Sequence, residues 1–585
     1  MVKINIHKLC IYLGLIAALM SGCAMETTPT PTFTATSKRT VKKTSKPKPT
    51  KKKTRKPEPS ATVEAESEHL AVRDLKAGWS EELIYQNDLV SPDALTLDGK
   101  GNLLIFDHCH KEIFRLNAEG EISKITKNNP IPVRTMAWQP NRGRLIAVAA
   151  GMLFELSGDK LELINEFEGV QTPSTIAVDP EDDSFYGCSE SNDQPINHYG
   201  PNGEKLETLE PSAGGCYQIA YDPQSKKVFY SETFKGQVVE IDLSSGESKV
   251  LAQEVGIPGT IEGISVALDE KGDLYFYDVY NGLNRYQDGQ FVQVMAPATG
   301  IGIFLFSPSH KGFVTSAGAG GNLALYNLVD SEVYELTPHL NSIAVVEMDS
   351  GEVLIADNNM LMEVTKSGIT PIGEAFPEFI MSMVKDKDGN IYIGLVNGRI
   401  FRYSGDGSIF DWGNLQPQNN LVYLSYDPAN NTLVATTENQ PQDTTTIWRV
   451  PVEDPSGDEE VIVLENRNSI AAADNQGNIY VLEGRERLYQ IDSEQGEATL
   501  FATSELPEGE IDLRSPNFVY SSIENGFVVG SNEFYALWSL ETGEKTNLAM
   551  NQCGADNFAI HETKEGDLIC VHSGQVFRLK YEPEE

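Results

Sequence analysis

Residues 98–107 read DGKGNLLIFD, a turn of Asp, Gly and Asn followed at once by a short apolar strand. Asp tolerates turn conformations and can bond its own backbone, and Gly supplies the positive φ of a hairpin. The same pattern returns at 269–278 (DEKGDLYFYD), 386–394 (DKDGNIYIG) and 474–483 (DNQGNIYVLE). This stretch therefore predicts a hairpin unit that the chain repeats.

The repeat has a regular spacing. Two further clear copies begin at 349 (DSGEVLIAD) and 562 (ETKEGDLICV), other copies turn with proline, and the weakest turns near Ser521. The full set of turns falls at 98, 139, 179, 222, 269, 307, 349, 386, 427, 474, about 521, and 562. Successive gaps run from 37 to about 47 residues, which is the length of one four-stranded blade of a β-propeller. Apolar alternation dominates and no proper amphipathic helix is visible, so the sequence predicts an all-β fold.

Twelve units could close into one very large ring or into two ordinary ones. Propellers usually have four to eight blades, which favours two tandem six-bladed β-propellers after a signal peptide and a disordered linker. A split into seven and five blades is the alternative. The expected limits are 1–22 for the signal peptide, 23–75 for the linker, 76–329 for the first propeller and 330–585 for the second.

Each ring must find a fourth strand for its last blade, because closure removes exposed sheet edges. Residues 82–86 (ELIYQ) precede the first unit, and the last unit stops after three strands. We expect 82–86 to complete the sixth blade and 332–337 (EVYELT) to cross over and complete the twelfth. The alternative is a twelfth blade closed by the N-terminal strand itself.

The N-terminus carries an export pattern. Lys3 and Lys8 precede a short apolar run at 10–20, and the residues at 20–23 are MSGC. This order resembles a bacterial lipoprotein signal, in which the Cys becomes the first mature residue and carries the lipid; Cys23 matches it. The resemblance implies a membrane-anchored protein on the extracytoplasmic face. An ordinary secretory signal or an anchor helix is the alternative.

The charge is unevenly distributed. The chain has 46 Lys and Arg against 85 Asp and Glu, a net charge of −39, yet eleven of the bases lie between residues 38 and 56. That segment is rich in Thr, Pro and Lys, cannot bury enough surface to fold, and should act as an extended stalk. The remaining body is strongly acidic, which excludes nucleic acid as its partner.

The repeats resemble the six-bladed propellers of the NHL-repeat and senescence-marker/gluconolactonase superfamily over most of residues 80–585. Gluconolactonase-like enzymes hold a divalent metal with carboxylates and an Asn in the central channel. Their first-blade signature is Glu-Gly-Pro, whereas this chain has Ser-Pro-Asp-Ala at 91–94; residues 260–263 (TIEG) resemble the signature better, but in the fifth unit. These departures weigh against an enzyme.

Propeller ligands generally meet the start of the inner strands and the loops after the second strands. At those places in the first ring we expect Asp93, Arg134, Tyr217 and Glu262 to bind ligand. The carboxylates of Asp107, Glu262 and Asp278 are candidates for Ca²⁺ or another divalent cation, which favours oxygen ligands. The alternative is that these groups are hydrogen-bonded strand ends lining a water-filled channel.

Corresponding places in the second ring carry mostly Asn. Asn there suits either a neutral sugar or the turn into each blade, and we favour the turn. The residues are Asn341, Glu378, Asn420, Asn468, Asn517 and Asp556.

The cysteines suggest one disulfide, since an exported protein permits them. Cys188 ends a second strand and Cys216 opens the next inner strand, so both should lie on the same face of neighbouring blades. A Cys553–Cys570 pair is a second possibility and would leave Cys109 unpaired. The alternative is five buried thiols.

No serine-nucleophile elbow, phosphate loop or HExxH motif is present. We therefore expect a surface-anchored lipoprotein with a binding or scaffolding role for an envelope protein, peptide or carbohydrate, acting through the propeller faces. The alternative is a metal-dependent hydrolase or lactonase acting in the first propeller channel.

Overall fold

The computed structural model describes residues 72–582 with internal gaps. The gaps are residues 88, 128–130, 168–171, 190, 254–263, 279–280, 297–302, 317–322, 337–341, 366–367, 405–406, 416–419, 440–443, 466–468, 484–485, 493–494, 504–516, 531–533, 552–557 and 573. Cys23, Glu262, Asn341, Asn468 and Asp556 therefore lie outside the described residues.

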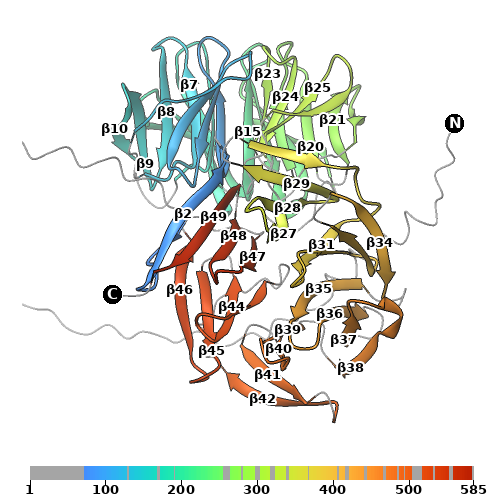
Figure 1. Cartoon of the computed structure of the whole chain (residues 1–585). Coiled ribbons are helices and arrows are strands. Elements are labelled where there is room, and N and C mark those ends of the chain that lie inside the picture. The colour runs from blue at the N-terminus through green and yellow to red at the C-terminus, as the bar shows by residue number, and fades with distance from the viewer. Residues whose placement is uncertain are drawn as a thin grey trace, which may run out of the picture. The chain divides into compact units, whose positions relative to one another are not determined.

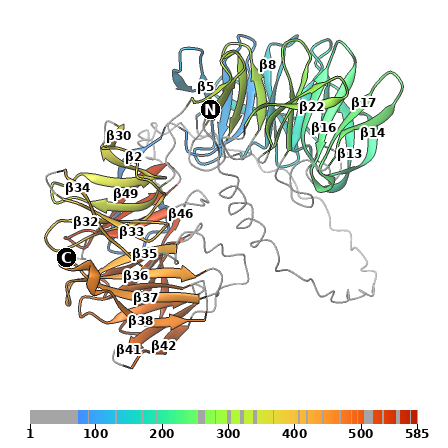
Figure 2. The ribbon, with the colours of Figure 1, turned by 90° about the vertical axis from the view of Figure 1, so that its right-hand side faces the viewer.

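The described residues form an all-β structure of antiparallel sheets, as the sequence predicts. Eleven sheets have four strands and one has five. Two short 3₁₀ turns, η1 (Thr233–Lys235) and η2 (Pro455–Gly457), are the helical elements of the described part. In that part, no helix is long and apolar enough to cross a membrane. Figure 2 shows β35, β36, β37 and β38 side by side in chain order, the arrangement that most of the sheets share.

The first strands of the sheets contact one another in two closed cycles. One cycle runs β3, β7, β11, β15, β19 and β23 and returns to β3, and the other runs β27, β31, β35, β39, β43 and β47 and returns to β27. We call the sheets of these cycles the first set and the second set, and the strands named here their inner strands.

The first set contains these strands: β3 (Pro92–Leu97), β4 (Leu103–Asp107), β5 (Glu112–Leu116), β6 (Ile122–Lys124), β7 (Thr135–Gln139), β8 (Arg144–Ala149), β9 (Met152–Ser157), β10 (Lys160–Glu166), β11 (Thr175–Val178), β12 (Phe185–Cys188), β13 (Asn192–Tyr199), β14 (Lys205–Gly214), β15 (Cys216–Asp222), β16 (Lys227–Glu232), β17 (Gln237–Asp242), β18 (Glu247–Ala252), β19 (Ile264–Leu268), β20 (Leu274–Asp278), β21 (Gly282–Gln287), β22 (Gln290–Met295), β23 (Phe304–Ser307), β24 (Gly312–Ser316), β25 (Leu323–Asn327) and β26 (Glu332–Glu335).

The second set contains these strands: β1 (Val72–Arg73), β2 (Trp79–Gln86), β27 (Ser342–Glu347), β28 (Val353–Asp357), β29 (Met360–Thr365), β30 (Gly368–Ile372), β31 (Ile380–Lys385), β32 (Ile391–Leu395), β33 (Arg399–Tyr403), β34 (Ile409–Asn414), β35 (Asn420–Asp427), β36 (Thr432–Asn439), β37 (Thr444–Pro451), β38 (Glu459–Leu464), β39 (Ser469–Ala473), β40 (Ile479–Glu483), β41 (Arg487–Asp492), β42 (Glu497–Thr503), β43 (Phe518–Ser521), β44 (Gly526–Gly530), β45 (Phe534–Ser539), β46 (Lys545–Asn551), β47 (Phe558–Glu562), β48 (Leu568–His572) and β49 (Gln575–Tyr581).

Each inner strand ends within two residues of its predicted turn. At the turn after β31, the Asp386 carboxylate accepts hydrogen bonds from the amides of Asp388 and Asn390 and from the Asn390 side chain, each at 2.9 Å. Gly389 has φ 82°, a left-handed conformation that favours glycine. In the repeated turn, the Asp side chain therefore accepts the hydrogen bonds, the Gly allows the chain to reverse, and the Asn side chain is a second donor to the Asp.

The closing strands differ from the expected exchange. β2 pairs antiparallel with β49 and completes the twelfth sheet (Figure 1). β26 pairs with β25 and completes the sixth. The crossover expected for residues 332–337 is wrong, and the alternative of a twelfth sheet closed by the N-terminal strand is what the structure has. The physical reason is local: a short hairpin, with Ser331 at φ 62°, returns β26 onto β25 with little loop-closure entropy.

The core is divided among neighbouring sheets. Phe304 of β23 stacks on Phe313 of β24 with ring centroids 4.4 Å apart, and Phe518 of β43 stacks on Phe527 of β44 at the same distance. Both pairs belong to buried clusters that also contain residues of the preceding sheet. The sheets are thus held face to face by apolar side chains, which fixes the inner strands whose ends build the site below.

Candidate functional site

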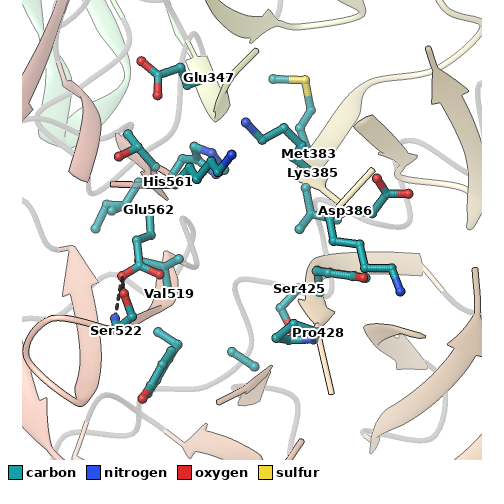
Figure 3. A pocket seen from close by; sticks show the side chains of 18 of the residues that line it. Glu347, Met383, Lys385, Asp386, Ser425, Pro428, Val519, Ser522, His561 and Glu562 are labelled. Carbon is teal, nitrogen blue, oxygen red and sulfur yellow. Dashed lines mark hydrogen bonds between the residues drawn. The ribbon is translucent and has the colours of Figure 1, made fainter. Parts of the chain in front are cut away.

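The second set encloses a cavity of about 1010 Å³ at the ends of its inner strands, where each strand meets its turn. Figure 3 shows the side chains of this wall converging from several strands. The acidic and basic residues of the wall, with its histidine, are Glu347, Asp349, Lys385, Asp386, Lys387, His561, Glu562, Lys564, Glu565 and Arg578. Because six strands end around one space, residues far apart in sequence become neighbours there.

The carboxylates of the wall are bound to protein donors. Asp386 also accepts from the Tyr392 hydroxyl at 3.2 Å, in addition to its turn bonds. Glu347 pairs with Arg578, and Glu562 accepts from the Ser522 hydroxyl at 2.8 Å. Burial raises the pKa of Glu562. Each of these three carboxylates is therefore bonded to at least one protein donor.

Lys385, the last residue of β31, is the least exposed of the three lysines in the wall. Its ammonium lies 3.3 Å from an Asp349 carboxylate oxygen, and the two side chains are 12% and 69% exposed. An ion pair with so exposed a carboxylate is weak, because water screens it. The Lys385 ammonium therefore keeps donor capacity that can be directed at a ligand.

His561, near the end of β47, points into the same cavity (Figure 3) and is 9% exposed. Its Nε2 atom has no hydrogen-bond partner among the described residues. Burial, together with the Lys385 charge, lowers the pKa of His561 to about 3. The imidazole is therefore neutral at ordinary pH.

Further polar atoms of this wall are buried without a partner in the described part of the chain. They are the hydroxyl oxygens of Ser425 and Thr563 and the Nε of Arg578. A buried polar group left unbonded costs about 1 to 3 kcal/mol. The wall thus has polar groups that a bound molecule would satisfy.

The first set has a smaller cavity, of about 470 Å³, also at the turn ends of its inner strands. Its wall is more apolar and includes Met136, Trp138 and Phe304. Asp93, Arg134 and Tyr217, the expected ligand-binding residues, lie instead at or just before the starts of β3, β7 and β15 and do not belong to this wall.

The expected ligand set is therefore not gathered around this cavity. Asp93 is exposed, and a carboxylate oxygen of Asp93 lies 3.5 Å from Nδ1 of His108. Arg134 is exposed and Tyr217 is half-buried. Glu262 lies outside the described residues, so a ligand role for these four residues stays a prediction.

Two of the expected cation ligands have their oxygens engaged by the protein. Buried Asp107 accepts from the amides of Val90 and Ser91 at 2.6 and 2.8 Å and from the amide and ring nitrogen of His110, both at 2.9 Å. Asp278 accepts from the Asn281 side chain at 2.8 Å. Within the described ranges, no group of three or more His, Cys, Asp or Glu side chains is placed to hold a metal ion.

Asp107 does not fit a cation site, because its four bonds hold the loop after β4. A site that includes Glu262 stays a prediction, since Glu262 is not described. The same loop carries His108, Cys109 and His110 as a turn.

Cys188 and Cys216 form a disulfide between β12 and β15, with Cα atoms 5.8 Å apart. Cys109 is also disulfide-bonded, and its partner lies outside the described residues. Cys570 is a free, buried thiol, and burial raises its pKa. The expectations of a Cys553–Cys570 pair and of an unpaired Cys109 are therefore wrong; Cys570 lies within β48 and packs in the core beside Tyr535.

Sequence reasoning missed the cavity of the second set because it looked for ligands at the starts of the inner strands. The signal was present at the opposite ends. Lys385-Asp386 and His561-Glu562 are titratable pairs at the points where an inner strand meets its turn. Their counterparts in the first unit, Leu97-Asp98 and Thr96-Leu97, lack the Lys and the His.

No protein-family model matches the chain, and no curated protein matches it. Among solved structures, two of the extracellular domain of BT4673 from B. thetaiotaomicron are 14% identical, with TM-scores of 0.32 and 0.30. They cover 86% of this chain and 82% and 83% of theirs. The GH74 xyloglucanase from Xanthomonas campestris is 12% identical over 86% of this chain and 93% of its own, with a TM-score of 0.46. At these values the similarities carry no conclusion about activity.

Proposed function

We propose that this chain is an exported, lipid-anchored binding protein that holds a small polar ligand in the cavity of the second set. The observation that carries the proposal is the cavity of about 1010 Å³, whose wall has buried polar atoms without a partner among the residues that the structure describes. Ligand sites are concave, of about 300–1,000 Å³, with a few convergent polar groups.

The proposal includes the closure of each set into a six-bladed propeller. The first would span about residues 92–335, and the second would span about 342–581 together with β1 and β2. The cyclic contacts of the inner strands and the even spacing of the turns support it. β2 and β26 each complete a last sheet within this scheme.

Export and anchoring are supported by different features. The residues before Cys23 have the order of a lipoprotein signal, and the Cys188–Cys216 disulfide is typical of proteins outside the cytoplasm. The Lys-rich stalk would extend the acidic body from the membrane, where an envelope carbohydrate, peptide or protein is the expected partner. The negative charge of the body opposes nucleic acid.

The test uses the full-length protein in detergent against arrays of envelope glycans and peptides. We expect specific capture that is lost in Ser425→Trp, which fills the cavity, and kept in Ser123→Trp, which adds the same bulk on exposed β6. Capture that persists in a folded Ser425→Trp protein would remove the cavity from the proposal. Radioactive palmitate should label the wild type and not Cys23→Ser.

A further inference from the structure

The second-set cavity has donor capacity that protein groups do not use. Three of its five carboxylates, Asp386, Glu347 and Glu562, accept from protein donors. A carboxylate can only accept hydrogen bonds, and these contacts occupy lone pairs of its oxygens.

The spare groups on the wall are of the opposite kind. Lys385 has three donors and, among the described residues, one ion pair, to the exposed Asp349. Ser425 and Thr563 each carry a hydroxyl without a partner in the described part of the chain. The neutral imidazole of His561 can donate from Nε2 in one tautomer without adding charge. Such a wall is complementary to a molecule rich in acceptor oxygens.

The charge of the wall narrows the class of molecule. Four of the chain's 46 basic residues, Lys385, Lys387, Lys564 and Arg578, lie in this wall of 28 residues, although the protein has a net charge of −39. Lys387 and Lys564 are exposed on their turns and have no ion pair among the described residues. A ligand anion would meet these ammonium groups at the rim before it reaches Lys385.

The acidic residues of the same wall limit the negative charge that any single group of the ligand can carry. Five carboxylates line it, namely Glu347, Asp349, Asp386, Glu562 and Glu565. A second negative charge on one ligand group would be repelled at short range where water is scarce. A singly charged carboxylate is therefore favoured over a dianionic phosphate.

We propose that the cavity binds a uronic-acid saccharide, with its carboxylate at Lys385 and His561 and its ring hydroxyls at Ser425 and Thr563. This inference rests on the proposed function, since it assigns a ligand class to the same cavity. The volume of about 1010 Å³ accommodates a short oligosaccharide rather than one small acid. Sugar oxygens both accept and donate, so they suit the hydroxyls, while the carboxylate takes the charged donor.

The test compares trigalacturonate with its methyl ester by titration calorimetry on the full-length protein in detergent. The two probes share rings and linkages, and in the ester each carboxylate is replaced by a neutral methyl ester. We expect the acid to bind at least tenfold more tightly than the ester, and this preference to disappear at high salt. Inorganic phosphate should not displace the acid at equal concentration.

Variants assign the effect to Lys385. We expect Lys385→Gln to weaken trigalacturonate binding at least tenfold, Lys385→Arg to restore most of it, and Lys249→Gln on exposed β18 to change nothing. The rescue by Arg separates charge from misfolding, and a melting curve checks the fold of each variant.

Several outcomes would overturn the inference. Equal binding of acid and ester, displacement by phosphate, or no binding of either probe would each exclude the uronate assignment. Array capture that stays sensitive to Ser425→Trp would, in those cases, leave the cavity as a ligand site. If the probes fail in this way and the array capture is also insensitive to Ser425→Trp, the proposed function is excluded as well.

Discussion

Lys385 and His561 project into one cavity from two different inner strands, β31 and β47, and the ammonium of the first helps to keep the imidazole of the second neutral (Figure 3). The two residues are 176 positions apart in the printed sequence. Their proximity is produced by the cyclic contacts of the inner strands, with β27 touching both β31 and β47.

The first prediction follows from the His561 pKa of about 3, which lies below the ordinary value of 6.5. Between these values the unfolded chain binds the proton and the native imidazole does not, so stability falls as pH falls from about 6.5 toward 3. The slope from this group is at most about 1.4 kcal/mol per pH unit. We expect the melting temperature of His561→Gln to fall less on acidification than that of the wild type.

His108 is the matched control for that experiment. Its pKa is raised by the Asp93 carboxylate, so any contribution to stability is present at low pH and is lost as pH rises through the folded pKa. His108→Gln should therefore still lose stability on acidification, as the wild type does. Parallel melting curves of His561→Gln and wild type between pH 7 and pH 4 would contradict the prediction.

The second prediction concerns the repeated turn. Asp386→Ala removes an acceptor of four hydrogen bonds, and at about 0.5–1.5 kcal/mol for each bond we expect a loss of about 2–6 kcal/mol. Asp388→Ala in the same turn is the control, since Asp388 is exposed, and should change stability by less than about 0.5 kcal/mol. Denaturant unfolding measures the stability of both variants. Equal losses would exclude a special role of Asp386 in stabilising the turn.

The sequence predicted the turns well because each turn is local chemistry. The Asp acceptor, the left-handed Gly and the Asn donor lie within five residues, so their spacing shows in the sequence. The pairing of β2 with β49 joins residues about 490 positions apart, and no local pattern distinguishes β49 from the edge of β25. Topology of that kind depends on which sheet still has a free edge.

The cavity was hidden for a related reason. Lys385 and His561 are single polar residues before turns, and only closure of the inner strands shows that they share a space. The Cys188–Cys216 pair was accessible to reasoning because its residues are in consecutive units, whereas Cys570 needed knowledge of which face of β48 is buried.

The third prediction is that the Cys188–Cys216 disulfide contributes about 3–4 kcal/mol, from the loop entropy of a 28-residue separation. The Cys188→Ala/Cys216→Ala variant should unfold at lower denaturant than wild type. Cys570→Ala, which removes a buried free thiol, should cost less, because only one sulfur is deleted from the core. If the double variant is as stable as Cys570→Ala, the disulfide contributes little to the free energy of unfolding.

The fourth prediction tests the closing strand. Deleting residues 79–86 removes β2 and leaves one edge of β49 without its partner, along with the 2.6 Å ion pair between Glu82 and Lys580. An unpaired edge is a template for association with another chain, so we expect the deletion to lower the melting temperature and to produce soluble oligomers in size-exclusion chromatography. Deleting residues 72–74 instead removes only β1, which pairs with β46 over two residues, and should leave the protein monodisperse to the same extent as wild type. If the two deletions behave alike, β2 is not what protects the edge of the twelfth sheet.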